Sequence, residues 1–297
     1  MSTRRDFLKQ SGLLASSLAI PAFMSSCQSG PKRYDYKPGL QLYTVRDAMS
    51  KDPKGSLAKV AEIGYVLMES ATYSGSELFY GMQPDEFSAV LKQNGLEIPS
   101  GHYALGDPQT KGTILSDWEK AVADAHKVGM KYMVCAYLPE ERRQTLDDYK
   151  QRAADFNKAG EICKQAGIQF CYHNHNFEFA AIDGQIPYDI LLAEADKDLV
   201  KMEMDIYWVT RSGNDPLALM DKHPGRFVLW HVKDMANTSD KSFTEVGNGV
   251  IDWPAIFAKA QESGMQHFFV EQDRCPGDPF DSIRQSIDYL KKNILKA

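Results

Sequence analysis

The sequence has few cysteines, and no two of them are closely spaced. Cys27 stands near the N-terminus, and Cys135, Cys163, Cys171 and Cys275 are scattered through a chain of 297 residues. Cysteine zinc sites use pairs about two to four residues apart, so this spacing argues against such a site. We expect the four later cysteines to be small packed side chains rather than disulfide partners, with Cys135 and Cys171 in strands.

The sequence gives no signal for two further classes of ligand, nicotinamide cofactors and nucleic acids. There is no glycine-rich phosphate loop of the Walker type and no dinucleotide fingerprint, which argues against a nicotinamide cofactor. The chain carries 34 basic and 40 acidic residues, a formal net charge of -6. A polyanion would find no surplus of positive charge, so we expect no nucleic-acid partner.

The apolar stretch at residues 12–24 is too short to cross a bilayer as a helix. It lies between an arginine pair, Arg4 and Arg5, and Cys27. This order resembles a twin-arginine export signal that ends in a lipoprotein cleavage box, which implies cleavage before Cys27 and acylation of that cysteine. We therefore expect residues 1–26 to be the export signal and residues 27–38 a lipid-anchored linker. The protein would be periplasmic or on the cell surface, touching the membrane only through the anchor; the alternative is a basic N-terminus before an amphipathic helix.

Five glycines, at positions 64, 95, 129, 167 and 264, each follow a helical stretch and precede a short apolar run. A glycine just past a helix can adopt the left-handed conformation that ends it, and the apolar runs suit strands buried on both faces. Alternating helices and parallel strands predict an α/β fold, a (β/α)8 TIM barrel over residues 39–297. The eight strands are expected near residues 39–44, 65–70, 97–102, 131–137, 168–175, 200–205, 227–233 and 267–273.

Polar residues stand at the carboxyl ends of these strands, where TIM barrels carry their chemistry. In the strand predicted at 168–175, alternation turns His173 and His175 toward the barrel interior. Two imidazoles are poor core fillers because each needs hydrogen-bond partners, which favours a functional pair. Asp205, His231 and Glu271, on three adjacent strands, offer nitrogen and oxygen donors that suit one divalent ion such as Mn²⁺, Zn²⁺, Co²⁺ or Fe²⁺.

Several motifs give the chain a family resemblance over about residues 36–295. It resembles the xylose isomerase-like barrel superfamily, also called sugar phosphate isomerases/epimerases, which includes ketose 3-epimerases and inosose dehydratase. The resemblance implies a divalent ion held at the ends of strands five to eight, with Asp205, His231 and Glu271 as three ligands. The epimerases use a glutamate on strand five; here we match His173 to that ligand position, with His175 second. The motifs are YHNHNFE at 172–178, DIYW at 205–208, HVKD at 231–234, GNGVIDW at 247–253 and VE at 270–271.

A metal that binds a carbonyl and a neighbouring hydroxyl stabilises the enediolate formed when the adjacent C–H loses its proton. We assign proton transfer to His175, Glu271 and Lys233, with a surface ion pair to Asp234 as the alternative role of Lys233. Four tyrosines near strand ends are candidates for stacking on a sugar, although some of them are expected in the core: Tyr43, Tyr73, Tyr103 and Tyr137. Substrate binding is assigned to Glu178, which matches a substrate-contacting acid of the epimerases, and to His102, Trp208 and Glu69.

The predicted function is a metal-dependent isomerase or epimerase that acts on a non-phosphorylated sugar or keto-sugar. An exported enzyme would meet few phosphorylated metabolites. The first alternative is a lyase or hydratase acting on a 3-keto-glycoside or related keto-sugar, favoured because histidines replace a carboxylate. A non-catalytic carbohydrate-binding lipoprotein is disfavoured by the complete donor set. An endonuclease is disfavoured by the acidic charge and by too few expected ligands for several metal ions.

Overall fold

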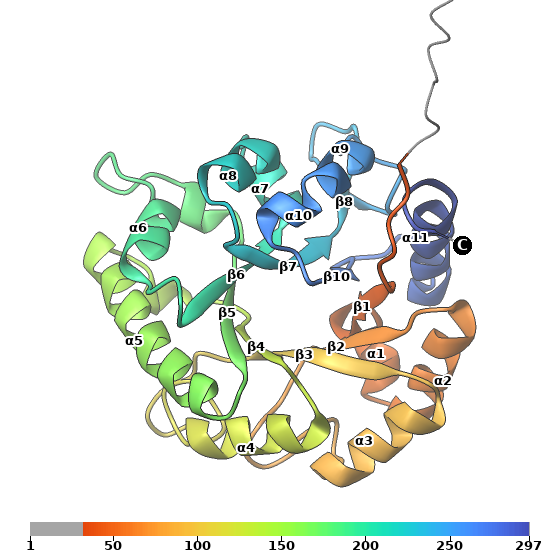
Figure 1. Ribbon diagram of the computed structural model, residues 1–297, viewed down its shortest axis with the longest axis horizontal. Helices are drawn as coiled ribbons and strands as arrows, with labels where there is room; N and C mark the ends of the chain where they lie inside the picture. The colour runs from red at the N-terminus through yellow and green to blue at the C-terminus, as the bar shows by residue number, and fades with distance from the viewer. Residues whose placement is uncertain (1–31, 297) are drawn as a thin grey trace, which may run out of the picture. The chain divides into compact units, whose positions relative to one another are not determined.

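A computed structural model describes residues 32–296. Its centre is a closed barrel of parallel strands in the order β1-β10-β7-β6-β5-β4-β3-β2, surrounded by helices (Figure 1). The predicted TIM barrel is therefore confirmed. The strands are β1 (Gly39–Gln41), β2 (Leu67–Ser70), β3 (Glu97–Tyr103), β4 (Tyr132–Cys135), β5 (Gln169–His173), β6 (Val200–Asp205), β7 (Phe227–Val232) and β10 (His267–Val270).

Short local signals begin and end the helices of the outer ring. Asp52, Asp215 and Asp278 each accept a backbone N–H at a helix start, and a proline follows each of them. That pairing satisfies a free donor and sets the first helical turn. The helices are α1 (Arg46–Met49), α2 (Pro53–Ile63), α3 (Pro84–Gln93), α4 (Trp118–Val128), α5 (Leu146–Gln165), α6 (Pro187–Glu194), α7 (Ile206–Arg211), α8 (Pro216–Lys222), α9 (Trp253–Ala258), α10 (Ala260–Ser263) and α11 (Pro279–Asn293).

The glycines that predicted the repeat have the expected backbone. Gly64 and Gly129 end α2 and α4 with φ of 105° and 100°, which a side chain would disfavour. All five predicted glycines have positive φ. Short 3-10 helices complete the connections: η2 (Leu42–Val45), η3 (Glu140–Arg142) and η4 (Phe177–Phe179); a hairpin of β8 (Asp234–Met235) and β9 (Phe243–Thr244) follows β7.

Apolar side chains form two layers. A small cluster inside the barrel includes Cys171, Leu229 and Phe269, and a larger one lies between strands and helices. Cys135 and Cys171 lie in β4 and β5 as predicted, and the four cysteines in the described part of the chain are free. Within that part no helix combines the length and apolar character needed to cross a membrane.

The predicted export signal and Cys27 lie outside the described residues. Within the described range, the chain already contacts the barrel before residue 39. The backbone N–H of Tyr34 donates to Ile294 O at 2.8 Å, and Lys296 N donates to Tyr34 O at 2.9 Å. The segment at 32–38, expected to be part of a linker, therefore carries a contact with the C-terminal end of the chain.

Strand β5 ends earlier than predicted, and the cause is a side chain. Asn174 Oδ1 accepts from Asp205 N at 3.1 Å, and Asn174 Nδ2 donates to Asp205 O at 3.4 Å. The Asn174 amide thereby takes the positions on β6 that a continuing strand would use. The strand stops at His173, so His175 lies in the following loop rather than in the strand.

Candidate active site

Three donors converge at the carboxyl ends of β6, β7 and β10. The β6–β7 register places Asp205 opposite His231, and Glu271 follows the last residue of β10. Glu271 Oε2 lies 2.9 Å from His231 Nδ1, and Asp205 Oδ2 lies 4.0 Å from the same nitrogen. All three side chains are buried, and their donor atoms lie within 4.8 Å of one another. The set fits a divalent ion that accepts mixed nitrogen and oxygen ligands.

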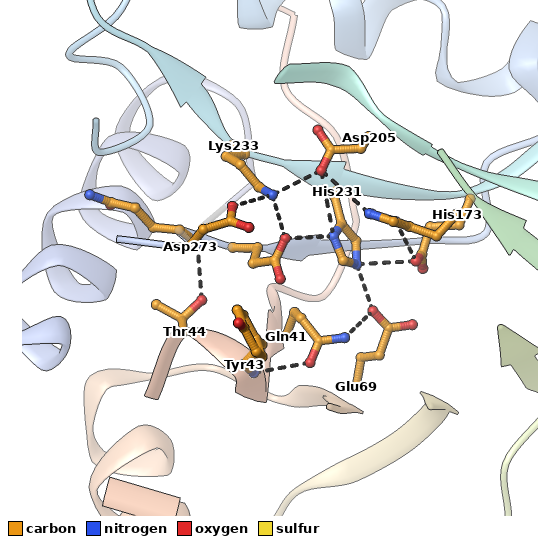
Figure 2. A network of polar contacts seen from close by, with 12 residues as sticks. Gln41, Tyr43, Thr44, Glu69, His173, Asp205, His231, Lys233 and Asp273 are labelled. Atoms are coloured by element: carbon orange, nitrogen blue, oxygen red, sulfur yellow. Dashed lines mark hydrogen bonds and ion pairs between the residues drawn. The ribbon is translucent and has the colours of Figure 1, made fainter. Parts of the chain in front are cut away.

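The two histidines of the YHNH motif take different positions. His173 Nδ1 lies 3.0 Å from Glu203 Oε2, so its Nε2 is directed toward Asp205 Oδ2, 3.6 Å away (Figure 2). His175 lies 4.9 Å from His173 between ring centroids, and its buried Nδ1 has no hydrogen-bond partner among the described residues. Burial, followed by the charge of Lys233, lowers the pKa of His175 to about 3. His175 therefore offers a neutral ring with a free nitrogen.

Lys233 is buried beside the donor set. Its Nζ lies 2.9 Å from Asp205 Oδ2, 2.6 Å from Glu271 Oε2 and 2.6 Å from Asp273 Oδ2 (Figure 2). Although burial lowers the pKa of Lys233, the three carboxylates raise it well above the usual value, so the ammonium stays charged.

The alternative of a surface ion pair between Lys233 and Asp234 is wrong. Asp234 accepts hydrogen bonds from Trp253 Nε1 and Gly247 N, both at 2.8 Å. The side chain of Asp234 thus fixes the segment that follows β9. Lys233, two residues beyond His231, instead reaches inward because residues two apart on an extended segment share a direction.

A second polar group lies deeper in the barrel, on the other side of His231. Glu69 Oε2 lies 2.7 Å from His231 Nε2, and Glu203 Oε2 lies 2.6 Å from His102 Nε2. Ser100 Oγ donates to Glu69 at 2.5 Å. Partners on Nε2 hold the ring so that Nδ1 faces Asp205 and Glu271, as outer carboxylates do for metal-bound histidines.

The two deep carboxylates have opposite pKa shifts. Burial, followed by the nearby Glu69, raises the pKa of Glu203 to about 7. Burial alone would raise the pKa of Glu69 too, but His102 and His231 lower it to about 2. Burial therefore favours the protonated form of Glu203, whereas the two histidines favour the charged form of Glu69.

Sequence reasoning missed Glu203 and Asp273. Each stands two residues from an assigned ligand, Asp205 or Glu271, so strand alternation was the signal that would have found them. The structure also brings together a second donor group, which shares His231 with the first. The expectation of too few clustered ligands for more than one ion is therefore not met. The second group is His102, His173, Glu203 and His231.

The assigned residues fall into four positions relative to an inner cavity of about 320 Å³. Glu69 is fully buried in the deep group and does not line this cavity. Trp208 lines an adjoining outer cavity. Tyr73 and Tyr103, offered as stacking candidates, are buried in the outer core instead. The inner cavity is lined by Tyr43, Ala71, His102, Ala136, Tyr137, His173, His175, Lys233, Glu271 and Asp273.

Glu178, assigned to substrate binding, is also fully buried away from the inner cavity. One carboxylate oxygen accepts the Tyr172 hydroxyl, and the other accepts the backbone N–H of His175 at 2.9 Å. Burial raises the pKa of Glu178 to about 7, against the effect of these hydrogen bonds. In the structure its contact is with the loop that carries His175.

Comparisons with known proteins agree on the fold. The family profile described as xylose isomerase-like TIM barrel matches residues 57–293. The chain is 23% identical over 292 residues to the inosose dehydratase of Geobacillus kaustophilus, which covers 86% of this chain and 90% of that protein. It is 27% identical over 165 residues to the inosose dehydratase of Lacticaseibacillus casei, covering 49% of this chain and 55% of that protein.

Solved structures give the same result. A sugar phosphate isomerase/epimerase from Parabacteroides distasonis superposes with a TM-score of 0.75 and 29% identity, covering 91% of this chain and 98% of that chain. The IolI protein, solved with a bound zinc atom, superposes with a TM-score of 0.67 and 16% identity, covering 86% and 99%. The second likeness shows a shared fold only.

Proposed function

Because the chain belongs to the xylose isomerase-like TIM barrel family, we propose that it is a metal-dependent carbon–oxygen lyase. It would remove the proton next to the carbonyl of a keto-sugar or keto-polyol and expel the oxygen substituent of the β-carbon, a hydroxyl group as water or, from a 3-oxo glycoside, the glycosidic oxygen with its aglycone as an alcohol. The dehydratase names of its curated relatives favour this reaction. Asp205, His231, Glu271 and His173 would hold the ion, which when bound supplies a Lewis acid that polarises the carbonyl.

One observation carries this choice: a neutral base and a charged acid line the same small cavity. His175 and Lys233 both face the inner cavity, the first with a free nitrogen and the second with a proton held by carboxylates. Elimination needs two unlike groups, one to accept the C–H proton and one to protonate the leaving hydroxyl. An epimerase needs two similar groups on opposite faces of one carbon, and this site has no such carboxylate pair on β5 and β10.

The proposed proton transfers follow from the charges around each group. His175 takes the C–H proton; the negative charge that develops on the substrate raises its low pKa during the step. Lys233 gives a proton to the departing oxygen, and the C–O bond breaks to release water or, from a 3-oxo glycoside, the aglycone alcohol. When a cation neutralises part of the charge on Asp205 and Glu271, Lys233 becomes a stronger acid.

A sugar isomerase or epimerase is the second candidate. It is favoured by the name of the Parabacteroides distasonis structure, which is 29% identical to this chain. In that reaction the same proton would return to the same or the neighbouring carbon instead of a hydroxyl leaving.

Proton NMR of the metal-loaded protein in D2O separates these functions. A panel of free sugars, inososes and 3-oxidised glycosides serves as substrates. We expect deuterium exchange next to the carbonyl, followed by a new vinylic signal from an unsaturated ketone as an inosose loses water or a 3-oxidised glycoside loses its aglycone. Exchange with only an epimer or isomer as product would assign the second candidate, and a complete lack of exchange would contradict both.

We also propose that the protein is exported through the twin-arginine route and anchored by a lipid on Cys27. The motif order of Arg4, Arg5 and Cys27 supports this. Changing both arginines to lysine should retain the protein in the cytoplasm, and Cys27→Ala should release it from membranes on fractionation. Membrane association that survives Cys27→Ala would contradict the anchor.

A further inference from the structure

A second cavity, of about 820 Å³, adjoins the inner one and shares Tyr43 and Asp273 with it. Small-molecule pockets span roughly 300–1,000 Å³. The inner cavity of about 320 Å³ is at the low end of that range. A single oxidised ring beside the donor set would leave the larger outer cavity without a role.

One wall of the outer cavity is a fixed group of three aromatic rings. Tyr207 lies 4.9 Å from Trp208 and 4.5 Å from Phe243 between ring centroids. The Tyr207 hydroxyl donates to Lys241 O at 2.7 Å, and Arg211 donates to the same carbonyl at 2.7 Å. These bonds tie the segment before β9 to α7, so the wall is formed before a ligand arrives.

The outer cavity is also lined by a further ring and a guanidinium. Tyr43 is 42% exposed, and the Arg46 guanidinium carbon lies 4.2 Å from the centroid of its ring. Arg46 donates to Asp273 O at 3.0 Å, which holds it at the junction of the two cavities. Aromatic faces and cations around one cavity match a ring that has apolar faces and hydroxyls at its edge.

A free donor marks the same wall. The indole Nε1 of Trp208 is buried and has no hydrogen-bond partner among the described residues. A buried donor without a partner is costly, and a ligand oxygen would satisfy it. The wall also reaches the inner site, because Lys233 Nζ lies 5.8 Å from the Trp208 ring centroid and 5.6 Å from that of Phe243.

We infer that the substrate is a glycoside of two sugar rings. Its oxidised ring occupies the inner cavity, and the second ring, joined through the glycosidic oxygen, lies in the outer cavity between Tyr43 and the wall of Tyr207, Trp208 and Phe243. This inference rests on the proposed function for the inner ring. The outer cavity then sets the preference for substrate length.

Three matched substrates test the inference: a free 3-oxo sugar, its methyl glycoside and a 3-oxo disaccharide, followed by deuterium exchange in D2O. We expect kcat/KM to be about 10-fold to 100-fold higher for the disaccharide than for the methyl glycoside, the ratio that one to two additional ring contacts provide. Phe243→Ala should remove most of that ratio through KM, lowering kcat/KM far more for the disaccharide than for the methyl glycoside.

Tyr36→Ala is the matched control, since this half-buried ring lines neither cavity. A phenyl 3-oxo glycoside provides a further comparison. Faster reaction of the phenyl compound than of the disaccharide would assign the outer cavity to an aromatic aglycone and overturn the two-sugar assignment. Equal kcat/KM for all substrates, with no effect of Phe243→Ala, would overturn the inference and leave the lyase function intact.

Calorimetry keeps the two proposals distinguishable. If no substrate exchanges a proton, the proposed function fails, and binding of the unoxidised disaccharide then decides the inference. We expect the disaccharide to bind about 10-fold more tightly than the methyl glycoside to the wild type, and equally weakly to Phe243→Ala. Equal binding to the wild type would overturn the inference.

Discussion

The two nitrogens of His231 face two different kinds of surroundings. On the Nε2 side, Glu69 is held by Ser100, Gln41 and His231 itself, so the group is closed by hydrogen bonds. On the Nδ1 side, Asp205 and Glu271 meet the ammonium of Lys233. The two sides therefore have different roles. Hydrogen bonds on the deep side fix the orientation of the His231 ring, and the carboxylates on the side facing the cavity can share their charge with another cation.

The largest expected effect comes from changing one carboxylate on each side. Asp205→Asn should strip the divalent ion and reduce kcat/KM by about 10³-fold or more, because a ligand with a full charge is lost. Glu203→Gln should keep the ion but weaken its binding by about 10-fold to 100-fold, the usual effect of an outer partner.

Metal analysis after gel filtration and steady-state kinetics check both variants. Asp189→Asn is the matched control, because Asp189 makes an exposed ion pair with Lys222 at 2.9 Å. If Glu203→Gln loses the ion as completely as Asp205→Asn, the deep side belongs to the donor set and the comparison fails.

Lys233→Met tests whether the ammonium of Lys233 neutralises the carboxylates on the cavity side and can be replaced by another cation. Without metal, the variant leaves three buried or half-buried carboxylates with no ammonium, so we expect about 3–5 kcal/mol of lost stability in urea unfolding. A divalent ion should restore more stability to the variant than to the wild type, and it should bind the variant more tightly.

The control is Lys201→Met, since Lys201 Nζ contacts only a backbone carbonyl, Gly225 O at 3.3 Å. An apoprotein of unchanged stability, or weaker metal binding by Lys233→Met, would show that Lys233 is not the counter-cation.

The histidine pair sharpens the comparison at the end of β5. His173→Ala should lower metal occupancy, because Nε2 points toward Asp205. His175→Ala should keep the ion and reduce turnover by roughly 10²-fold, the usual loss of a general base. Metal content and kcat of both variants, beside His223→Ala as a half-buried histidine outside the site, decide the assignment. The reverse pattern would exchange the two roles.

The smallest effect concerns Glu178, which holds the loop of His175 from outside the barrel. Burial raises the folded-state pKa of Glu178 from 4.5 to about 7. The unfolded chain therefore releases this proton first, and the stability that Glu178 contributes falls as pH rises from 4.5 to 7. Glu178→Gln should remove about 2–3 kcal/mol of that pH dependence.

Urea unfolding between about pH 3 and 8 measures this difference, because the Glu178 effect lies above pH 4.5 and the Glu245 effect lies below it. Glu245→Gln is the contrasting control. Burial opposes the shift, but hydrogen bonds, including one from Ser282 Oγ at 2.8 Å, lower the pKa of Glu245. Its stability contribution is present above the unfolded pKa and is lost as pH falls, so the two variants should deviate from the wild type in opposite directions. Parallel curves for Glu178→Gln and the wild type would contradict the raised pKa.

The barrel could be predicted from the sequence because its strands carry local sequence signals. Glycines such as Gly64 and Gly129 end the preceding helix through their own backbone conformation, and the strand ends of a parallel barrel must meet at one rim. That rule alone brought Asp205, His231 and Glu271 together. The rule does not say how deep each side chain lies along the barrel axis, so it did not predict that Glu69 is buried below the cavity.

Two features depended on contacts that no local pattern reports. The end of β5 is set by the side chain of Asn174, which bonds to Asp205 of the neighbouring strand β6, and a period of two cannot reveal this contact. The burial of Lys233 depends on three carboxylates from two other segments. Long-range neutralisation of charge is a property of the assembled barrel.

Lys233 also bears on when the protein acquires its ion. Many small metal proteins stay unfolded until the metal arrives, because metal binding supplies their folding free energy. Here an ammonium carried by the chain itself already lies among Asp205, Glu271 and Asp273. We expect the barrel to complete its folding in a metal-poor environment and to be loaded afterwards, so that the supply of metal controls activity without controlling how much folded protein accumulates.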